Sequence, residues 1–321
     1  MMNTRLSLSI ALATYNGERF LAEQLDSIAR QTRLPDELVI SDDASVDSTR
    51  AIALDFAGRA PFPVRLLTNS ERLGSTRNFE VAIRACGGNI IFLCDQDDVW
   101  YPNKMALIEE RFTTDFGVGV VFTDADVVDQ NLHPLGLRLW EAARFRRLEQ
   151  TQVEAGDTFS VLLKRYLVTR ATMAFRSRYR DLLLPIPDVW VHDAWIAMLM
   201  GATSQLAALP TPLIAYRQHD ANQIGIPRRG KNRGMTCATI HGLQVLRYEE
   251  ALKRLLEFGD RFPESGHNIR RLEETLDFLR AVAALPDARW RRLPGALREL
   301  VALRYHRYAK GFRSFRRDLL R

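Results

Sequence analysis

The chain has 321 residues, 46% of them hydrophobic and 26% charged, a balance that excludes a disordered or collagen-like protein. Its net charge of +6 is concentrated at one end, since residues 289–321 hold eleven Lys or Arg against two acidic residues. Nucleic-acid binding needs basic residues spread along a groove with aromatic platforms, so an anionic surface is the better partner for this tail.

The first 95 residues alternate between apolar runs and segments with helical spacing. The runs predict strands at 6–14, 37–41, 64–68 and 90–94, and the spacing predicts helices at 18–31, 48–56 and 78–86. Pro35 stops the first helix and Gly87-Gly88 the third. This order predicts an α/β fold, a mostly parallel sheet with helices on both faces, in which ligands bind beyond the carboxyl ends of the strands.

Acidic residues gather where strands end. Two follow the second strand, three follow the fourth, and three lie in or just after the apolar run that begins at residue 118: Asp42, Asp43, Asp95, Asp97, Asp98, Asp124, Asp126 and Asp129. The carboxyl ends of parallel strands share one edge, so we expect a carboxylate-rich edge of the sheet.

The remaining elements divide the chain in two. Helices at 158–166 and 191–200 and a strand at 172–176 complete a first domain of residues 1–225. Beyond the turn-rich segment 227–231, helices alone are expected, at 242–258, 269–284 and 295–315, in a C-terminal region of residues 226–321. Two alternatives stay open for the basic tail: a helix lying on anionic lipid, or a solvated helix packed on the domain.

The cellular setting is suggested by the cysteines and by the N-terminus. Cys86, Cys94 and Cys237 are an odd number at no metal-ligand spacing, which favours a reducing compartment. The sequence shows neither a signal peptide nor an apolar run near the roughly 18 residues of a membrane span. We therefore expect a cytoplasmic protein, bound peripherally to the inner membrane face if the tail contacts lipid.

The segment Asp95-Gln96-Asp97-Asp98 follows a predicted strand. Two carboxylates at this spacing can hold Mg²⁺ or Mn²⁺ in one loop and leave coordination positions for phosphate oxygens. Acidic loops after strands are also common as solvated turns. The motif alone therefore indicates a metal site without establishing one.

Five motifs together resemble the family 2 glycosyltransferases of the GT-A fold, and the later ones are most similar to the bacterial rhamnosyltransferase branch. They span about residues 5–225 and read TYNG from Thr14, VISDDAS from Val39, LCDQDDVWYPNK from Leu93, WVHDAW from Trp190 and YRQHDANQ from Tyr216. The resemblance implies transfer of a sugar from a nucleotide-diphosphate donor to a hydroxyl of a saccharide or lipid-linked acceptor.

Donor-binding residues follow from the matched positions. The resemblance implies that the nucleotide is bound by Thr14, Tyr15, Asn16, Asp43, Arg77, Asn78, Asp95 and Gln96. The Asp43 carboxylate could accept the N3–H of uracil or thymine, which favours dTDP or UDP donors. Arg77 and Asn78 are equally explained as the start of a capped helix.

The metal and the base are implied in the same way. Asp97 matches the metal-ligating aspartate, and His219 matches a histidine of a C-terminal loop that often binds the same metal, although a lone histidine is as often a surface or core residue. Asp193 matches the carboxylate that deprotonates the acceptor, which implies inversion at the anomeric carbon. Taken by itself, Asp193 is better explained as an acidic residue at a helix N-terminus, and its place after the other motifs favours the base.

Two further residues are expected on the acceptor side. Trp195 could stack on a sugar ring, although aromatic residues near strand ends are more often core. Arg170 stands where relatives have a small residue, so it either contacts an anionic acceptor such as a lipid-linked phosphate or extends to solvent.

These residues predict an inverting, metal-dependent glycosyltransferase, with L-rhamnose from dTDP-rhamnose as the donor sugar to test first and a surface polysaccharide as the product. Two other classes remain. Asp95 to Val99 also fits the Asp-X-Asp-X-Val motif of haloacid-dehalogenase-like phosphotransferases, although that motif belongs on the first strand of its fold. The other is a non-catalytic scaffold that binds sugar or membrane.

Overall fold

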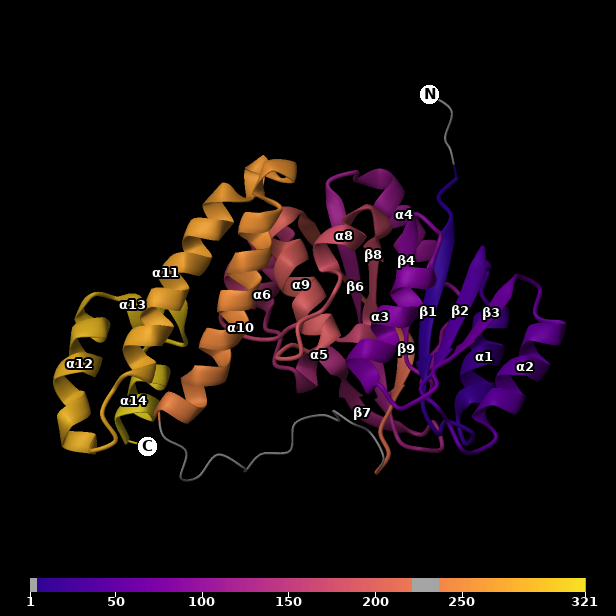
Figure 1. The fold of residues 1–321 in the computed structure, drawn as a ribbon, viewed down its shortest axis with the longest axis horizontal. Coiled ribbons are helices and arrows are strands. Elements are labelled where there is room, and N and C mark those ends of the chain that lie inside the picture. The colour runs from indigo at the N-terminus through magenta and orange to yellow at the C-terminus, as the bar shows by residue number, and fades with distance from the viewer. Residues whose placement is uncertain (1–4, 221–236, 321) are drawn as a thin grey trace.

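The computed structural model describes residues 5–220 and 237–320 (Figure 1), and its parallel sheet is built from the first four strands. These are β1 (Leu8–Thr14), β2 (Glu37–Asp42), β3 (Val64–Thr68) and β4 (Ile90–Cys94), which lie side by side in the order β3-β2-β1-β4. They alternate with α1 (Leu21–Ala29), α2 (Thr49–Arg59) and α3 (Ser75–Ala85). The predicted α/β alternation is confirmed, and β3 and β4 have the predicted bounds.

The sheet continues as a mixed sheet. Its other strands are β5 (Val99–Trp100), β6 (Val118–Val128), β7 (Pro134–Arg138), β8 (Met173–Arg176) and β9 (Gln205–Arg217). β8 is antiparallel to both β4 and β6, while β9 is parallel to β6 and antiparallel to β5. Neither β7 nor β9 was among the predicted strands.

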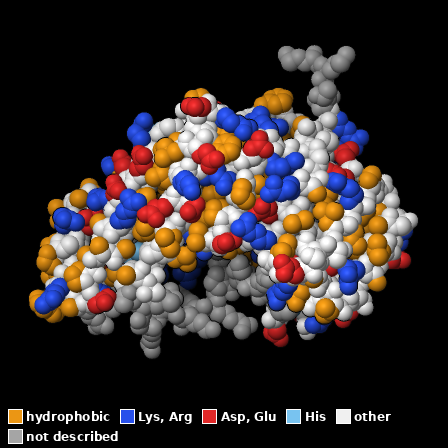
Figure 2. Space-filling model, in the orientation of Figure 1, with side chains coloured by type: hydrophobic (Ala, Val, Ile, Leu, Met, Phe, Trp, Pro, Cys, Tyr) orange, Lys and Arg blue, Asp and Glu red, His pale blue; other side chains and the backbone are white. Residues whose placement is uncertain are grey.

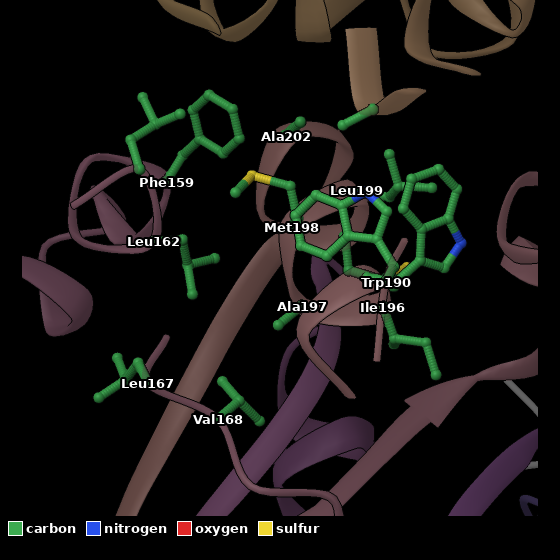
Figure 3. Packing of buried hydrophobic residues seen from close by; sticks show 14 of the residues in the cluster. Phe159, Leu162, Leu167, Val168, Trp190, Ile196, Ala197, Met198, Leu199 and Ala202 are labelled. Carbon is green, nitrogen blue, oxygen red and sulfur yellow. The ribbon is translucent and has the colours of Figure 1, made fainter. Parts of the chain in front are cut away.

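Side chains that alternate along the strands enter two hydrophobic cores, one on each face of the sheet. On β1, Ile10 and Leu12 enter the core covered by α1, α2 and α4 (Lys104–Thr114), whereas Ala11 enters the other. That second core is closed by α3 and by α6 (Arg147–Glu154), α7 (Thr158–Leu162), α8 (Arg180–Leu183) and α9 (His192–Thr203). In Figure 3, side chains of α9 pack against Phe159 and Leu162 of α7 and against Trp190.

The C-terminal region is helical, as predicted. α10 (Cys237–Glu257) and α11 (Gly266–Ala283) lie beside α9 and share its core (Figure 1). Tyr248 of α10 donates a hydrogen bond to the Leu163 carbonyl at 2.8 Å, and Trp190 donates to the Arg247 carbonyl at 2.9 Å. The predicted boundary between residues 225 and 226 lies outside the described residues and stays a prediction.

The expectation of one helix over residues 295–315 was wrong. Three helices occupy the tail: α12 (Arg289–Val301), α13 (Arg304–Tyr308) and α14 (Phe312–Leu320). The breaks fall at Leu303 and Gly311, both with a left-handed φ of +58° that no α-helix contains. Among the described helices, none is both long enough and apolar enough to cross a bilayer.

Candidate active site

A pocket of about 460 Å³ opens at the carboxyl ends of β1, β2 and β4, where the sequence predicted a carboxylate-rich edge. Nearly all the predicted donor-binding and metal-binding residues line it: Thr14, Tyr15, Asn16, Asp43, Asn78, Asp95, Gln96, Asp97 and His219. The structure therefore brings together residues that lie up to 205 positions apart in the sequence.

Asp97 and His219 meet at this pocket. Nε2 of His219 lies 2.9 Å from Oδ2 of Asp97, and the His219 ring packs on Phe20 with centroids 4.8 Å apart. Asp95, Asp97 and Asp98 each present an oxygen within 4.8 Å of the others. Carboxylate oxygens with one imidazole nitrogen form a donor set suited to Mn²⁺ or Mg²⁺, so the residues present fit such an ion.

Asp98 differs from its two neighbours because it is directed into the protein. It is buried, and its Oδ1 accepts the backbone N–H of Arg217 at 3.0 Å. Burial, followed by the charges of Asp97 and Asp95, raises the pKa of Asp98 well above its usual range. Asp98 thus ties the acidic loop to the end of β9.

Residues of the TYNG segment are held in place by neighbouring loops. Gln96 accepts the Tyr15 N–H at 2.8 Å and donates to the Tyr15 carbonyl at 3.1 Å, which joins the ends of β1 and β4. Asn16 adopts a φ of +45°, and its N–H donates to Ser45 at 2.9 Å. Thr14 donates to Asp42 at 3.0 Å. The strand ends are therefore fixed before any ligand binds.

Asp43 holds a loop as well as lining the pocket. Its two oxygens accept the N–H groups of Leu73 and Gly74 at 2.7 and 2.8 Å. Oδ1 also accepts the Asn69 side-chain amide at 3.2 Å, whereas Oδ2 can accept a second hydrogen bond, so the predicted contact with a base N3–H stays open to Oδ2 of Asp43.

The adjacent residues Arg77 and Asn78 have different positions. Asn78 is buried and donates to the carbonyls of Ser41 and Thr14, so it cross-links β1 and β2 beneath the pocket. Arg77 lies outside this pocket and pairs with Glu80 and Asp188 at 2.8 and 2.6 Å. The expectation that Arg77 contacts the donor is not supported, because its charge is neutralised on another face of α3.

A second pocket, of about 430 Å³, contains Asp193 at the start of α9 together with Tyr166 and Arg247. Arg170 lines this pocket as well as the first. Its guanidinium pairs with Asp95, and its backbone N–H donates to Asp193 at 3.3 Å. The expectation that Arg170 extends to solvent was wrong, because the neighbouring carboxylate holds this side chain between the two pockets. Contact between Arg170 and an anionic acceptor stays a prediction.

Electrostatic effects in this group follow from burial. Burial raises the pKa of Asp95 to about 6, and it raises that of Asp193, while the Arg170 guanidinium lowers both. Burial alone would lower the pKa of Arg170, but Asp95 and Asp193 outweigh it and raise that pKa. Arg170 therefore favours the ionised form of both carboxylates.

Trp195 belongs to the core. Its side chain is fully buried, and its indole N–H donates to the Leu183 carbonyl at 2.8 Å. It lies against Trp190 with ring centroids 5.6 Å apart and lines neither pocket. The prediction that Trp195 contacts the acceptor was wrong, because position 195 falls on the inward face of α9.

Several residues of the two pockets were not predicted. Arg72 lies over the Tyr15 ring at 4.1 Å, and Arg19, Phe20 and Gln130 complete the donor-side wall. Tyr166 is exposed in the second pocket beside Arg247. None of them lies in the segments that carry the resemblance, although Arg19 and Phe20 come two and three residues after TYNG.

Comparison with protein families identifies the chain over half its length. The family model described as glycosyl transferase family 2 matches residues 9–169. A dTDP-rhamnosyl transferase, RfbG, of Shigella flexneri is 28% identical over 229 residues, covering 67% of this chain and 73% of RfbG. An uncharacterized glycosyltransferase of a Nostoc strain is 25% identical over 222 residues, 68% of this chain.

Coverage of the relatives is partial. The match spans 66% of the Nostoc protein and 59% of an uncharacterized Mycobacterium bovis protein that is 26% identical over 216 residues. The chain therefore matches slightly less than two thirds of the length of these relatives.

Solved structures share the fold. TarS 1-349 of S. aureus, in complex with UDP-GlcNAc, has a TM-score of 0.54 at 16% identity and covers 90% of this chain and 89% of its own. A mannosyltransferase from Pyrobaculum calidifontis, in complex with GDP-Man and Mn²⁺, has a TM-score of 0.52 at 21% identity, covering 94% and 75%. The expected GT-A-like fold with a helical C-terminal region is confirmed, and the chain belongs to glycosyl transferase family 2.

Proposed function

We propose that the protein is an inverting glycosyltransferase that moves a sugar from a nucleotide-diphosphate donor to an acceptor hydroxyl. The arrangement of the two pockets carries this proposal. The first holds a cation-binding donor set, the second holds a half-buried carboxylate, and Arg170 lines both. Donor and acceptor bound in these pockets would meet at the Asp95–Arg170–Asp193 group.

Donor binding is assigned to the first pocket. We expect Tyr15, Asn16 and Asp43 to surround the nucleoside, and Arg72 to face the base or ribose from its position over Tyr15. A divalent ion held by Asp97, His219 and Asp95 would neutralise charge on the departing diphosphate. Arg170 orients Asp95 toward this site through their ion pair.

Acceptor activation is assigned to Asp193. Its carboxylate takes the proton of the attacking hydroxyl, whose oxygen bonds to the anomeric carbon as the bond from that carbon to the diphosphate oxygen breaks. Attack from the face opposite the leaving group inverts the anomeric centre. The raised pKa of Asp193 makes it a stronger base than an exposed aspartate, and the Arg170 guanidinium favours its ionised form.

The donor sugar to test first is L-rhamnose from dTDP-rhamnose. Support comes from RfbG, a dTDP-rhamnosyl transferase that aligns with two thirds of this chain. A pyrimidine base also suits Asp43, whose Oδ2 retains a lone pair for an N3–H donor. UDP-sugars present the same N3–H and the same diphosphate, so they belong in the same experiment.

The decisive experiment measures Mn²⁺-dependent binding and slow hydrolysis of dTDP-rhamnose, UDP-glucose, UDP-galactose and UDP-N-acetylglucosamine. The wild-type protein should turn over one donor, and Asp97→Ala should lose that turnover with EDTA reproducing the loss. Asp36→Ala, which alters a carboxylate near the amino end of β1, is the matched control. Failure of wild type to bind any of the four donors would refute the donor assignment.

The two other functional classes have no comparable support. A haloacid-dehalogenase-like phosphotransferase needs its Asp-X-Asp on the first strand, whereas Asp95 follows β4 and the chain belongs to a different family. A non-catalytic scaffold would not need the Arg170-coupled carboxylates that both pockets share.

We further propose that the outer face of α12 contacts anionic lipid. The tail helices pack inward through Tyr305, Tyr308 and Phe315, yet α12 leaves Trp290 and Val301 74% and 75% exposed. Leu293 and Leu297 continue the same stripe at helical spacing, with Arg291 and Arg298 exposed beside it. Apolar residues flanked by arginines suit the interface of an anionic bilayer.

Vesicle co-sedimentation tests this contact. Wild type should bind vesicles containing phosphatidylglycerol and not those of phosphatidylcholine alone, and Trp290→Glu/Leu297→Glu should lose the binding. The control Leu54→Glu/Phe116→Glu changes two other exposed apolar residues outside the tail and should bind normally. Equal loss in both double variants would refute a role for α12.

A further inference from the structure

A cavity larger than either of the two pockets above lies elsewhere in the described part of the chain. It measures about 760 Å³ and lies between the turn that joins α5 (Leu139–Ala142) to α6 and residues 310–320 of the tail, which include α14. In Figure 2 the surface is hollowed between the C-terminal helices and the sheet domain, with Lys or Arg side chains inside the hollow. We call this cavity the basic cleft.

Seven cationic side chains and a single carboxylate line the basic cleft. The cationic residues are Arg144, Arg146, Arg165, Lys310, Arg313, Arg316 and Arg317, and the carboxylate is Glu149. Three come from the α/β part of the chain and four from the tail, so the cleft exists only because the tail packs back on the sheet domain.

Most of this charge is uncompensated. Arg165 pairs with Glu149 at 3.0 Å, and Arg317 pairs with Asp318 at 2.7 Å. Within the described residues, the side chains of the other four arginines of the cleft have no carboxylate within 4.0 Å: Arg144, Arg146, Arg313 and Arg316.

The surrounding cations change the pKa of Lys310. Desolvation lowers its pKa, and repulsion from Arg165 and Arg313 lowers it further against the weaker pull of Glu149. A cluster of cations that repel one another is stabilised when an anion binds among them.

The basic cleft adjoins the pocket of the proposed base. Arg165 lines the basic cleft on one side and the Asp193 pocket on the other, and its guanidinium is fixed by Glu149 and by the carbonyls of Ala143 and Arg144. A ligand that reached Asp193 through one sugar could therefore place a second, anionic group among these arginines.

We propose that the basic cleft binds a diphosphate group carried by the acceptor, a deeper assignment that rests on the proposed glycosyl transfer. Guanidinium groups bind phosphate oxygens in pairs, and two linked phosphates offer enough oxygens for several arginines from both walls. The acceptor class is then a sugar linked through a diphosphate to a carrier, and its hydroxyl lies at Asp193.

Isothermal titration with inorganic pyrophosphate, inorganic phosphate and geranyl diphosphate tests this site, in EDTA so that the donor pocket holds no metal. Wild type should bind both diphosphates and bind inorganic phosphate at least tenfold more weakly. Arg313→Gln/Arg316→Gln should weaken diphosphate binding at least tenfold. The control Arg270→Gln/Arg307→Gln removes the same charge from exposed positions outside the cleft and should bind as wild type does.

Donor hydrolysis by the same variants separates the two proposals. Normal hydrolysis by Arg313→Gln/Arg316→Gln, together with lost diphosphate binding, would support a distinct acceptor-side site. Absence of donor turnover in wild type would remove the proposed function and leave the anion site measurable by itself. No diphosphate binding by wild type, equal loss in the control, or binding of inorganic phosphate without geranyl diphosphate would overturn the acceptor assignment.

Discussion

The guanidinium of Arg170 should influence the pH dependence of the proposed reaction. Burial raises the pKa of Asp193 and Arg170 lowers it, so replacing the arginine leaves the raising effect unopposed. A base must be deprotonated to act, so kcat/KM falls as the pH drops through the pKa of Asp193. Arg170→Gln is expected to shift this acidic limb to higher pH, as measured from kcat/KM profiles.

Two further variants test whether Asp193 is the group that titrates. Asp193→Asn should reduce kcat by roughly 10²- to 10⁴-fold, the usual contribution of a positioned base, while leaving nucleotide affinity unchanged. Arg65→Gln, which breaks an ion pair with Glu37 far from both pockets, should leave the profile unaltered. If the acidic limb of Arg170→Gln stays where it is in wild type, Asp193 is not the group that titrates.

Single residues of the site were predictable to the extent that they lie in motifs at strand ends. Asp97 and His219 are 122 positions apart, and the matched motifs pointed to both residues, which the structure brings within 2.9 Å of each other. Arg77 and Trp195 were assigned wrongly because a motif gives a position in the chain, whereas the face of the helix decides where a side chain points. Arg72 carried no signal, since its role depends on a loop that lies over Tyr15.

At the scale of elements, substitutions at the breaks between the tail helices should change the stability of the protein. Gly311 has a φ of +58°, and an added Cβ would lie 2.8 Å from the His306 ring. Gly311→Ala should therefore lower the free energy of unfolding by roughly 1–2 kcal/mol, the cost of a left-handed non-glycine residue.

At Leu303 the opposite substitution, to glycine, should stabilise the protein. It has the same φ of +58° and is 64% exposed, so Leu303→Gly removes backbone strain with little loss of packing. We expect a gain of up to about 1 kcal/mol, reduced by the greater freedom of glycine in the unfolded chain. Urea denaturation measures both variants, and a loss of stability in Leu303→Gly would show that its side chain matters more than its backbone.

Elements with strong local patterns were predicted well and the others were not. β3 and β4 are continuous apolar runs between helices, and their bounds were predicted to the residue. β9 was missed because Pro210 and Pro212 interrupt a 13-residue strand whose middle is partly exposed. The three tail helices were merged into one because their apolar spacing continues past Leu303, while the left-handed turn there has no glycine to mark it.

At the scale of the whole molecule, the contact between α10 and α14, the first and last helices of the C-terminal region, should depend on pH. Asp318 of α14 is fully buried, and its carboxylate lies 3.2 Å from His241 of α10 and 2.7 Å from Arg317. Burial alone would raise the pKa of Asp318, but hydrogen bonds from His241 and Arg317 outweigh it, and the pKa is lowered.

The sign of the effect follows from that lowered pKa. The stabilisation is fully present above the unfolded aspartate pKa of about 3.9 and is lost as the pH falls through the folded value. Asp318→Asn should cost roughly 1.5–3 kcal/mol at pH 7 and should flatten the decline in stability below pH 4. Thermal unfolding from pH 3 to 7 measures this, and a variant curve parallel to wild type would exclude Asp318 as the cause.

Arg217, at the end of β9, connects segments that are distant in the sequence. Its guanidinium donates to the Asp97 and Gln130 carbonyls and pairs with Glu23 of α1, while its N–H donates to Asp98. For protein engineering, these contacts of Arg217 determine which segments must be exchanged together. A chimera that takes its donor pocket from another family member must take β9 from the same protein as the segments that Arg217 contacts. A junction between β9 and those segments would pair His219 of one protein with Asp97 of the other.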